Sequence, residues 1–134
     1  MKKMTLILMV MFCGLLFSGC GGGTPSSVVE KAVNAVIQAD ADELFKYLYD
    51  CPDHRKMYIR DYFERSEYSH STHVYFIYRG VVNFKIESER IFDNGDKAEV
   101  IVNSFIKSGE GRTDAFQLVK TSNGWKINSR LENF

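Results

Sequence analysis

Hydrophobic residues are spaced in three different ways along this 134-residue chain, and each spacing predicts a different kind of structure. Residues 4–17 are almost all apolar, a run too short to span a bilayer as a mature helix. From residue 25 onward apolar residues recur at helical spacing, and after Gly80 they alternate with polar ones. The pattern therefore predicts a separate N-terminal segment, then helices, then strands.

Two helices are predicted in the first part of the folded region. The first begins with a capping-box pattern, in which Ser27 is followed three residues later by Glu30 and Pro25 lies just upstream. Its apolar face consists of Val29, Ala32, Val33, Val36 and Ile37. A second helix is predicted to begin at Asp40 and to end at residues 51–53. Its expected buried side consists of Leu44, Phe45, Tyr47 and Leu48.

A third helix is predicted over residues 54–67. The residues expected to face inward are Met57, Tyr58, Tyr62 and Phe63. Residues 69–79 suit either a strand or a buried helical turn, and the helix is favoured because Gly80 is a typical helix stop.

Four strands are predicted after Gly80, because apolar and polar residues alternate there with a period of two. The positions expected to face the core are Val82, Phe84, Ile86, Ala98, Val100, Val102, Phe116, Leu118, Trp125 and Ile127. Tight turns are predicted at residues 93–96, 108–112 and 122–124. Three short connections in a row require antiparallel neighbours, so we expect a four-stranded meander with the helices on one face of a curved sheet, an α+β fold.

The N-terminal segment has the features of an export signal. Lys2 and Lys3 precede the apolar run, and residues 17–20 (Phe-Ser-Gly-Cys) resemble the lipobox of bacterial lipoproteins. The resemblance implies cleavage before Cys20 and acylation of that residue, although Phe17 stands where the family usually has Leu. An ordinary secretory signal or an uncleaved anchor remains the alternative. We expect a signal peptide over residues 1–19, a tether over 20–24 and one domain over 25–134.

The predicted location is the cell envelope, with the domain outside the cytoplasm. Gly21 follows the cysteine where lipoproteins retained in the inner membrane have Asp, which favours the outer membrane in a double-membraned bacterium. Cleavage also removes two lysines, so the mature chain has fewer basic than acidic residues and no basic stripe for nucleic acid. Cys51 is then the only expected free thiol, which excludes an intramolecular disulfide.

Several segments in a fixed order carry a resemblance to one family. They are residues 24–29 (Thr-Pro-Ser-Ser-Val-Val), 39–48, 95–100, 116–120 and 123–127 (Asn-Gly-Trp-Lys-Ile). With these segments in this order, the chain resembles a family of small bacterial lipoproteins of unknown function. The proteins of that family have a nuclear transport factor 2-like (NTF2-like), cystatin-like domain. The resemblance implies a cone-shaped domain with a pocket between sheet and helices. It implies no reaction, because this fold hosts enzymes, binding modules and assembly proteins.

A metal site and a catalytic site were both weighed. Cys51, His54, His70 and His73 are residue types that bind zinc, but they lack a recognised zinc framework, so we expect no metal and no cofactor. Acid–base catalysis would draw on Asp50, Asp53, His54, Asp61, Tyr47, Tyr58 and Tyr62. None has an apolar context that predicts a raised pKa, and Asp50 and Asp53 should raise the pKa of Cys51. An enzyme is therefore not favoured.

Aromatic residues supply the candidate ligand-binding positions. They are Tyr47, Tyr58, Tyr62, Phe84, Phe116 and Trp125, which either fill the core or line a concave site. The favoured function is a non-catalytic envelope module, held to the membrane through lipid on Cys20, that binds a small molecule, peptide or protein. The alternatives are a small enzyme with an Asp or His in the cone, and a structural lipoprotein that forms homodimers through its sheet.

Overall fold

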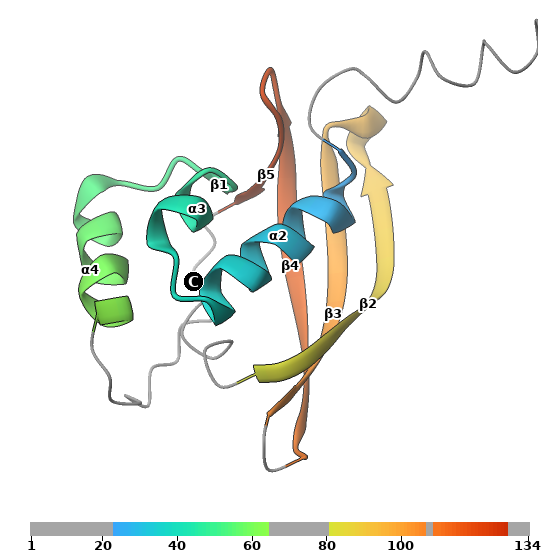
Figure 1. The fold of residues 1–134 in the computed structure, drawn as a ribbon. Coiled ribbons are helices and arrows are strands. Elements are labelled where there is room, and N and C mark those ends of the chain that lie inside the picture. The colour runs from blue at the N-terminus through green and yellow to red at the C-terminus, as the bar shows by residue number, and fades with distance from the viewer. Residues whose placement is uncertain (1–22, 65–80, 107–108, 129–134) are drawn as a thin grey trace, which may run out of the picture.

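A long helix lies across one face of a twisted sheet, and two further helices lie beyond one end of it (Figure 1). This computed structural model describes residues 23–64, 81–106 and 109–128. The helices are α2 (Pro25–Ile37), α3 (Ala41–Phe45) and α4 (Asp53–Glu64). The predicted α+β architecture is confirmed. Among the described residues, no helix has both the length and the apolar character needed to cross a bilayer.

The sheet has five strands in the order β1-β5-β4-β3-β2. Their bounds are β1 (Leu48–Tyr49), β2 (Val81–Phe92), β3 (Lys97–Ile106), β4 (Gly111–Thr121) and β5 (Gly124–Asn128). Strands β2 to β5 pair antiparallel in chain order, which confirms the predicted meander. The predicted turn after β2 is also confirmed, since Asp93 and Asn94 have φ values of 51° and 58° and Gly95 follows with 91°.

Strand β1 was not predicted, and the second helix is shorter than expected. The helix α3 ends at Phe45, so the prediction that it continues to residue 51 is wrong. The chain then joins the sheet, because the amide of Ile127 donates a 2.7 Å hydrogen bond to the carbonyl of Tyr47 and Leu48 pairs in parallel with Ile127. Leu48 is buried as expected, but it is buried in a strand.

The start of α2 also differs from its prediction. Thr24, and not Ser27, is the N-cap residue, because its hydroxyl oxygen accepts a hydrogen bond from the Ser27 amide at 3.2 Å. The Ser27 hydroxyl in turn accepts from the Thr24 amide at 3.1 Å, which completes a capping box. Pro25 takes the first helical position, where its missing N–H costs nothing. The preference of proline for this position therefore moves the helix start toward the N-terminus.

The core lies between α2 and the facing side of β3, β4 and β5. Val29, Val100 and Ile127 are completely buried there, and Phe116 and Leu118 are 1% exposed. The period-two prediction for β3 and β4 is thus confirmed at the centre of the sheet. The remaining core residues of these elements are Val28, Ala32, Val33, Ala35, Val36, Ala98, Val102 and Trp125.

Helix α4 packs through part of the face expected for it, with Tyr62 and Phe63 buried as predicted. Ile59, Tyr62 and Phe63 are buried, whereas Met57 is 69% and Tyr58 is 52% exposed. The prediction that Met57 and Tyr58 face inward is therefore wrong. The three buried residues follow the i, i+3, i+4 spacing of one helix face, and Ile59 takes the position on it that was expected for Met57 and Tyr58. The predictions for residues 65–79 lie outside the described residues.

Candidate functional site

A sharp turn between α2 and α3 forms one wall of a pocket. Helix α2 ends at Ile37 with Gln38 as its C-cap, and Ala39 follows with a φ of 55°. The amide of Asp40 donates a 2.8 Å hydrogen bond back to the Ala35 carbonyl, which fixes the turn. Asp40 is then the N-cap of α3, as the sequence predicted, because its Oδ1 accepts from the Glu43 amide at 3.0 Å. The turn leaves residues 38–42 facing α4.

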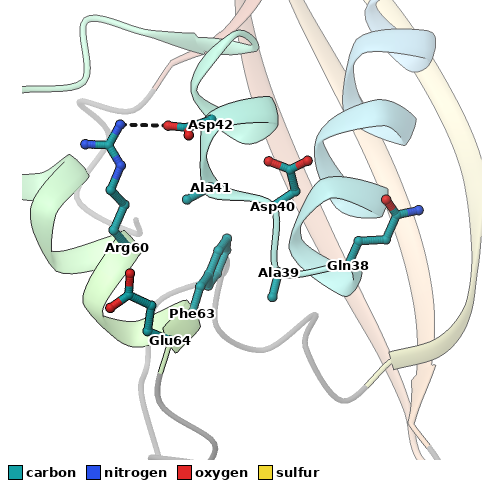
Figure 2. A pocket seen from close by; sticks show the side chains of 8 residues that line it. All are labelled: Gln38, Ala39, Asp40, Ala41, Asp42, Arg60, Phe63 and Glu64. Atoms are coloured by element: carbon teal, nitrogen blue, oxygen red, sulfur yellow. Dashed lines mark hydrogen bonds and ion pairs between the residues drawn. The ribbon is translucent and has the colours of Figure 1, made fainter.

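The opposite wall comes from the end of α4. Arg60, Phe63 and Glu64 are three and four residues apart, so they share one helix face. Together with residues 38–42 they line a pocket of about 570 Å³, which is within the size range of small-molecule sites (Figure 2). The Phe63 ring, 6% exposed, points toward Ala39 and Ala41 and gives the pocket an apolar floor.

An ion pair joins the two walls across the pocket. Arg60 donates from Nη2 to Oδ1 of Asp42 at 2.7 Å, and its guanidinium carbon lies 5.1 Å from the centre of the Phe45 ring (Figure 2). Because the Arg60 and Asp42 side chains are 51% and 79% exposed, the pair adds little to global stability. The pair is a direct contact between α4 and the first turn of α3.

The pocket has a negative rim. Asp40, Asp42 and Glu64 contribute three carboxylates, while Arg60 contributes one positive charge. The Arg60–Asp42 pair is neutral as a unit, so two carboxylates remain in excess beside an apolar floor. Such a rim favours a ligand that carries a positive charge and a short apolar portion.

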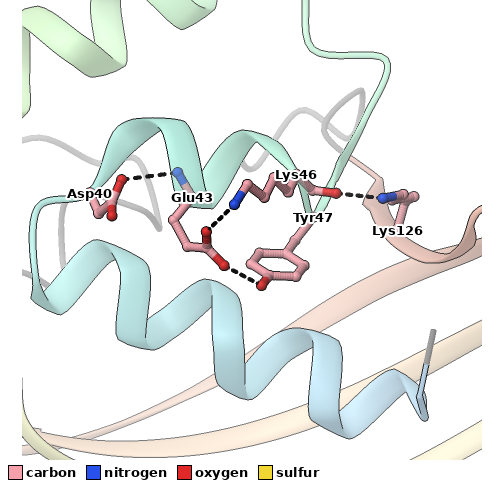
Figure 3. A network of polar contacts seen from close by, with 5 residues as sticks. All are labelled: Asp40, Glu43, Lys46, Tyr47 and Lys126. Carbon is pink, nitrogen blue, oxygen red and sulfur yellow. Dashed lines mark hydrogen bonds and ion pairs between the residues drawn. The ribbon is translucent and has the colours of Figure 1, made fainter.

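A second polar network fixes α3 to the sheet (Figure 3). The Tyr47 hydroxyl donates to Glu43 Oε1, and Lys46 Nζ donates to Glu43 Oε2. Lys126 of β5 donates from Nζ to the Lys46 carbonyl oxygen. The network joins the pocket wall at Asp40, through α3, to the central part of the fold.

The same network changes two pKa values. The hydrogen bond to Glu43, helped by burial, raises the pKa of Tyr47 to about 12. The hydrogen bond from Lys46, followed by the one from Tyr47, lowers the pKa of Glu43 below its usual 4.5. Glu43 is therefore ionised and Tyr47 neutral over the physiological range, the state in which both hydrogen bonds form.

Comparison with known proteins defines the family. The model of a family described as a domain of unknown function (DUF4878) matches residues 18–128. The chain belongs to this family. A crystal structure from Campylobacter jejuni, described as that of a candidate NTF2-like transpeptidase, is also similar. The two structures superpose with a TM-score of 0.57 at 15% sequence identity. The match includes 81% of this chain and all of the Campylobacter jejuni chain. No curated protein matches the sequence.

These comparisons establish the fold of this DUF4878 domain as NTF2-like and leave its function open. The structural likeness confirms the expected fold class, because it extends over the whole of the similar chain at a TM-score of 0.57. At 15% identity the likeness carries no information about activity.

The six aromatic candidates of the DUF4878 domain are not gathered at the pocket. Tyr62, Phe116 and Trp125 are buried in the core, and Lys120 lies 5.8 Å over the Trp125 ring. Phe84 is half-buried on β2, Tyr47 is bonded to Glu43 and Tyr58 is largely exposed. None of the six belongs to the eight residues that line the pocket described above.

The described Asp, His and Cys candidates for metal binding and catalysis lie on α4 and in the turn before it. Asp50, Asp53, His54 and Asp61 are exposed, while Cys51 is half-buried. Burial raises the pKa of the Cys51 thiol, and Asp53 adds a smaller contribution in the predicted direction. His70 and His73 lie outside the described residues. Within the described ranges, no three His, Cys, Asp or Glu side chains are grouped to hold a metal ion.

Two buried polar residues of the DUF4878 domain were missed by the sequence analysis. Asp114 is 8% exposed and accepts a 2.7 Å hydrogen bond at Oδ1 from Nε of Arg112, and Ser104 is 2% exposed. Both lie on the helix-covered side of the sheet. Asp114 is two residues before the core residue Phe116 in β4, and Ser104 is two residues after the core residue Val102 in β3. Extending the period-two pattern by one position would have found them.

Proposed function

We propose that this protein is a non-catalytic binding domain, anchored in the cell envelope by lipid on Cys20, and that its ligand occupies the pocket between the α2–α3 turn and α4. The observation that carries the proposal is a pocket with an apolar floor and a charged rim, whose walls are joined by the Arg60–Asp42 pair. A site already fixed before binding loses little free energy to ordering when the ligand arrives.

The charge of the rim narrows the class of ligand. Asp40 and Glu64 are not balanced by the Arg60–Asp42 pair, and Phe63 offers an apolar surface beneath them. A primary amine or guanidinium on a short methylene chain complements both features, as in the basic side chain of a peptide. The proposed ligand is therefore a cationic small molecule or a basic peptide segment.

The anchoring part of the proposal rests on the sequence before the domain. The lipobox-like segment ends at Cys20, and the family model already matches from residue 18. Acyl chains on one cysteine would hold the domain at a membrane surface without a spanning helix. The outer membrane is the proposed location if the source bacterium has two membranes.

The two alternatives have less support. The catalytic candidates Asp50, Asp53 and His54 are exposed, and the buried carboxylate Asp114 is paired with Arg112. Dimerisation through the sheet would cover an outer face that carries polar cross-strand pairs. These pairs are Thr113–Asn103 at 2.6 Å, Gln117–Glu99 at 2.7 Å and Arg90–Glu99 at 3.5 Å.

Fractionation of cells that express Cys20→Ala tests the anchor. The wild-type protein should sediment with membranes and migrate as the processed form, and the Cys20→Ala variant should be unprocessed or soluble. Cys51→Ala is the matched control and should behave as wild type. Sedimentation of Cys20→Ala in the processed form would contradict acylation at this residue.

Titration of the lipidated protein in nanodiscs tests the pocket. The probe is a blocked tripeptide with a central lysine, and the matched control is the same tripeptide with a central glutamate. Amide resonances of Ala39, Ala41 and Phe63 should shift with the lysine peptide and not with the glutamate peptide. Equal shifts with both peptides, or none, would contradict the proposed site.

A further inference from the structure

The first residues of the folded domain are fixed beside the end of β2. The amide of Ser26 donates a 2.8 Å hydrogen bond to Oε2 of Glu89, which joins the start of α2 to that strand. Gly23 has a φ of 69°, and a Cβ there would collide with the Ser27 hydroxyl of the capping box. In Figure 1, the start of α2 lies beside the ends of β2 and β3 that meet at the turn Asp93–Gly95.

The chain between this end and Cys20 is very short. Only Gly21 and Gly22 separate Cys20 from Gly23, so the anchored residue lies within about 11 Å of the domain even when the tether is fully extended. Whatever surface Cys20 is attached to, this end of the domain must therefore lie next to it.

The side chains at this end are suited to contact with lipid. Ile91 is 50% exposed, although it is on the same sheet face as the core residue Ala98 with which it pairs. On the opposite face of the same strand, the guanidinium of Arg90 lies 5.4 Å from the centre of the half-buried Phe92 ring. This end of β2 therefore carries an exposed aliphatic side chain on one face and an aromatic–arginine pair on the other. Both can contact lipid if this end of the domain lies at the membrane surface.

We infer that the end of the domain formed by the start of α2 and the β2–β3 turn rests on the membrane, with Ile91 in contact with lipid. The inference rests on the proposed acylation of Cys20. It also orients the ligand site, because the pocket lies at the other end of α2. A helix of 13 residues is about 20 Å long, so the pocket faces away from the lipid surface.

The charges at this end exclude electrostatic attraction as the main cause of contact. Glu89 is bonded to the start of α2, Asp93 lies 3.3 Å from Lys97, and Arg90 lies 3.5 Å from Glu99. With Asp96 included, the segment 89–97 has a net charge of −1. The contact should therefore be apolar and should form equally well on zwitterionic lipid.

Fluorescent labelling of the full lipidated protein tests this orientation. An environment-sensitive label is placed at Ile91→Cys in a Cys51→Ser background, and the protein is reconstituted in phosphatidylcholine vesicles. The matched control is the same label at Phe105→Cys, because Phe105 is 43% exposed near the other end of β3. We expect a blue shift and quenching by nitroxide-labelled lipid at position 91, and an aqueous spectrum without quenching at position 105.

The possible outcomes separate this inference from the proposed anchor. If the protein sediments with the vesicles but position 91 is quenched no more than position 105, the orientation is wrong and the anchor stands. Quenching at position 91 that requires anionic lipid would also overturn the apolar contact. If the wild-type protein does not sediment with vesicles at all, the anchor itself is wrong and the inference is lost with it.

Discussion

The α2–sheet region and the α3–α4 region of this domain are held together by different interactions. In the first, the apolar face of α2 packs on completely buried residues such as Val100 and Ile127. In the second, Leu44, Ile59 and Phe63 are also buried, but exposed or partly exposed polar contacts are added to this packing. These contacts are the Arg60–Asp42 pair, the Arg60–Phe45 contact and the bonds of Glu43 to Lys46 and Tyr47.

The two kinds of interaction have different effects, one on the stability of the domain and the other on the geometry of the pocket. Burial of apolar surface is the main stabilising contribution to a small domain, whereas exposed ion pairs contribute little free energy. The polar contacts of the α3–α4 region instead hold the walls of the pocket in place. Substitutions of buried residues should therefore lower the free energy of unfolding, and substitutions in the exposed polar contacts of the second region should change local structure around the pocket.

The largest effect is expected for Phe116→Ala. Phe116 is 1% exposed between α2 and the sheet, so its truncation should lower the free energy of unfolding by about 3–5 kcal/mol. Urea unfolding followed by the fluorescence of Trp125, the single tryptophan, measures the change. Phe105→Ala is the control, because Phe105 is 43% exposed and should change stability far less. Similar losses for both would contradict the placement of the core.

A smaller effect is expected at the start of α2. Thr24→Ala removes the hydroxyl that accepts from the Ser27 amide and should cost about 1 kcal/mol. Thr24→Ser keeps the hydroxyl and should stay close to wild type in the same urea experiment. A loss of stability in Ser27→Ala but not in Thr24→Ala would instead favour Ser27 as the N-cap, the helix start expected from the sequence.

Tyr47→Phe tests the link between α3 and the sheet. Loss of the hydrogen bond to Glu43 should cost about 1 kcal/mol near neutral pH. Because the folded-state pKa of Tyr47 is raised to about 12 and the unfolded value is about 10, this contribution is complete below pH 10 and is lost as the pH rises toward 12. The two proteins should therefore converge in stability over that interval. If the free energies of unfolding of wild type and Tyr47→Phe differed by the same amount from pH 8 to 12, the hydrogen bond would not be the cause of that difference.

The smallest change in global stability is expected for Arg60→Ala. Arg60 forms an exposed ion pair and an aromatic contact, and Arg90 does the same with Glu99 and Phe92, so Arg90→Ala is a closely matched control. Each should lower the free energy of unfolding by less than about 1 kcal/mol. Only Arg60→Ala should increase amide hydrogen exchange in α4. Unchanged exchange in α4 would show that the ion pair does not hold the pocket wall.

The regular parts of the fold were predictable because their patterns are local. Val100 and Val102 alternate with polar residues, and Val29 and Val33 repeat at helical spacing, so each pattern identifies a buried face without knowledge of its partner. Strand β1 was not predictable in this way. A strand of two residues has no period, and it exists because the Tyr47 carbonyl meets the Ile127 amide from the far end of the chain.

The candidate site was less predictable than the fold. The sequence indicated Asp40 as a helix start and Phe63 as an inward-facing residue, and both line the pocket. The sequence did not predict that these two residues lie close together. Residues 38–42 and 60–64 line one pocket only because α3 and α4 pack at a particular angle, which no local pattern specifies. The rotation of α4 was also only partly predictable, because hydrophobicity identified Tyr62 and Phe63 as buried but wrongly placed Met57 and Tyr58 beside them.

The most direct test of the account is the affinity of the lysine tripeptide for Asp40→Asn/Glu64→Gln, measured by calorimetry on the lipidated protein in nanodiscs. Asparagine keeps the cap of α3, so the double variant removes two rim charges with little change of shape. The account predicts that the wild-type protein binds and that the double variant binds at least about tenfold more weakly, a change of about 1.4 kcal/mol. Asp93→Asn/Asp96→Asn, with the same change of net charge at the distant turn, should bind as wild type. Equal affinity in all three proteins would contradict the pocket as the binding site.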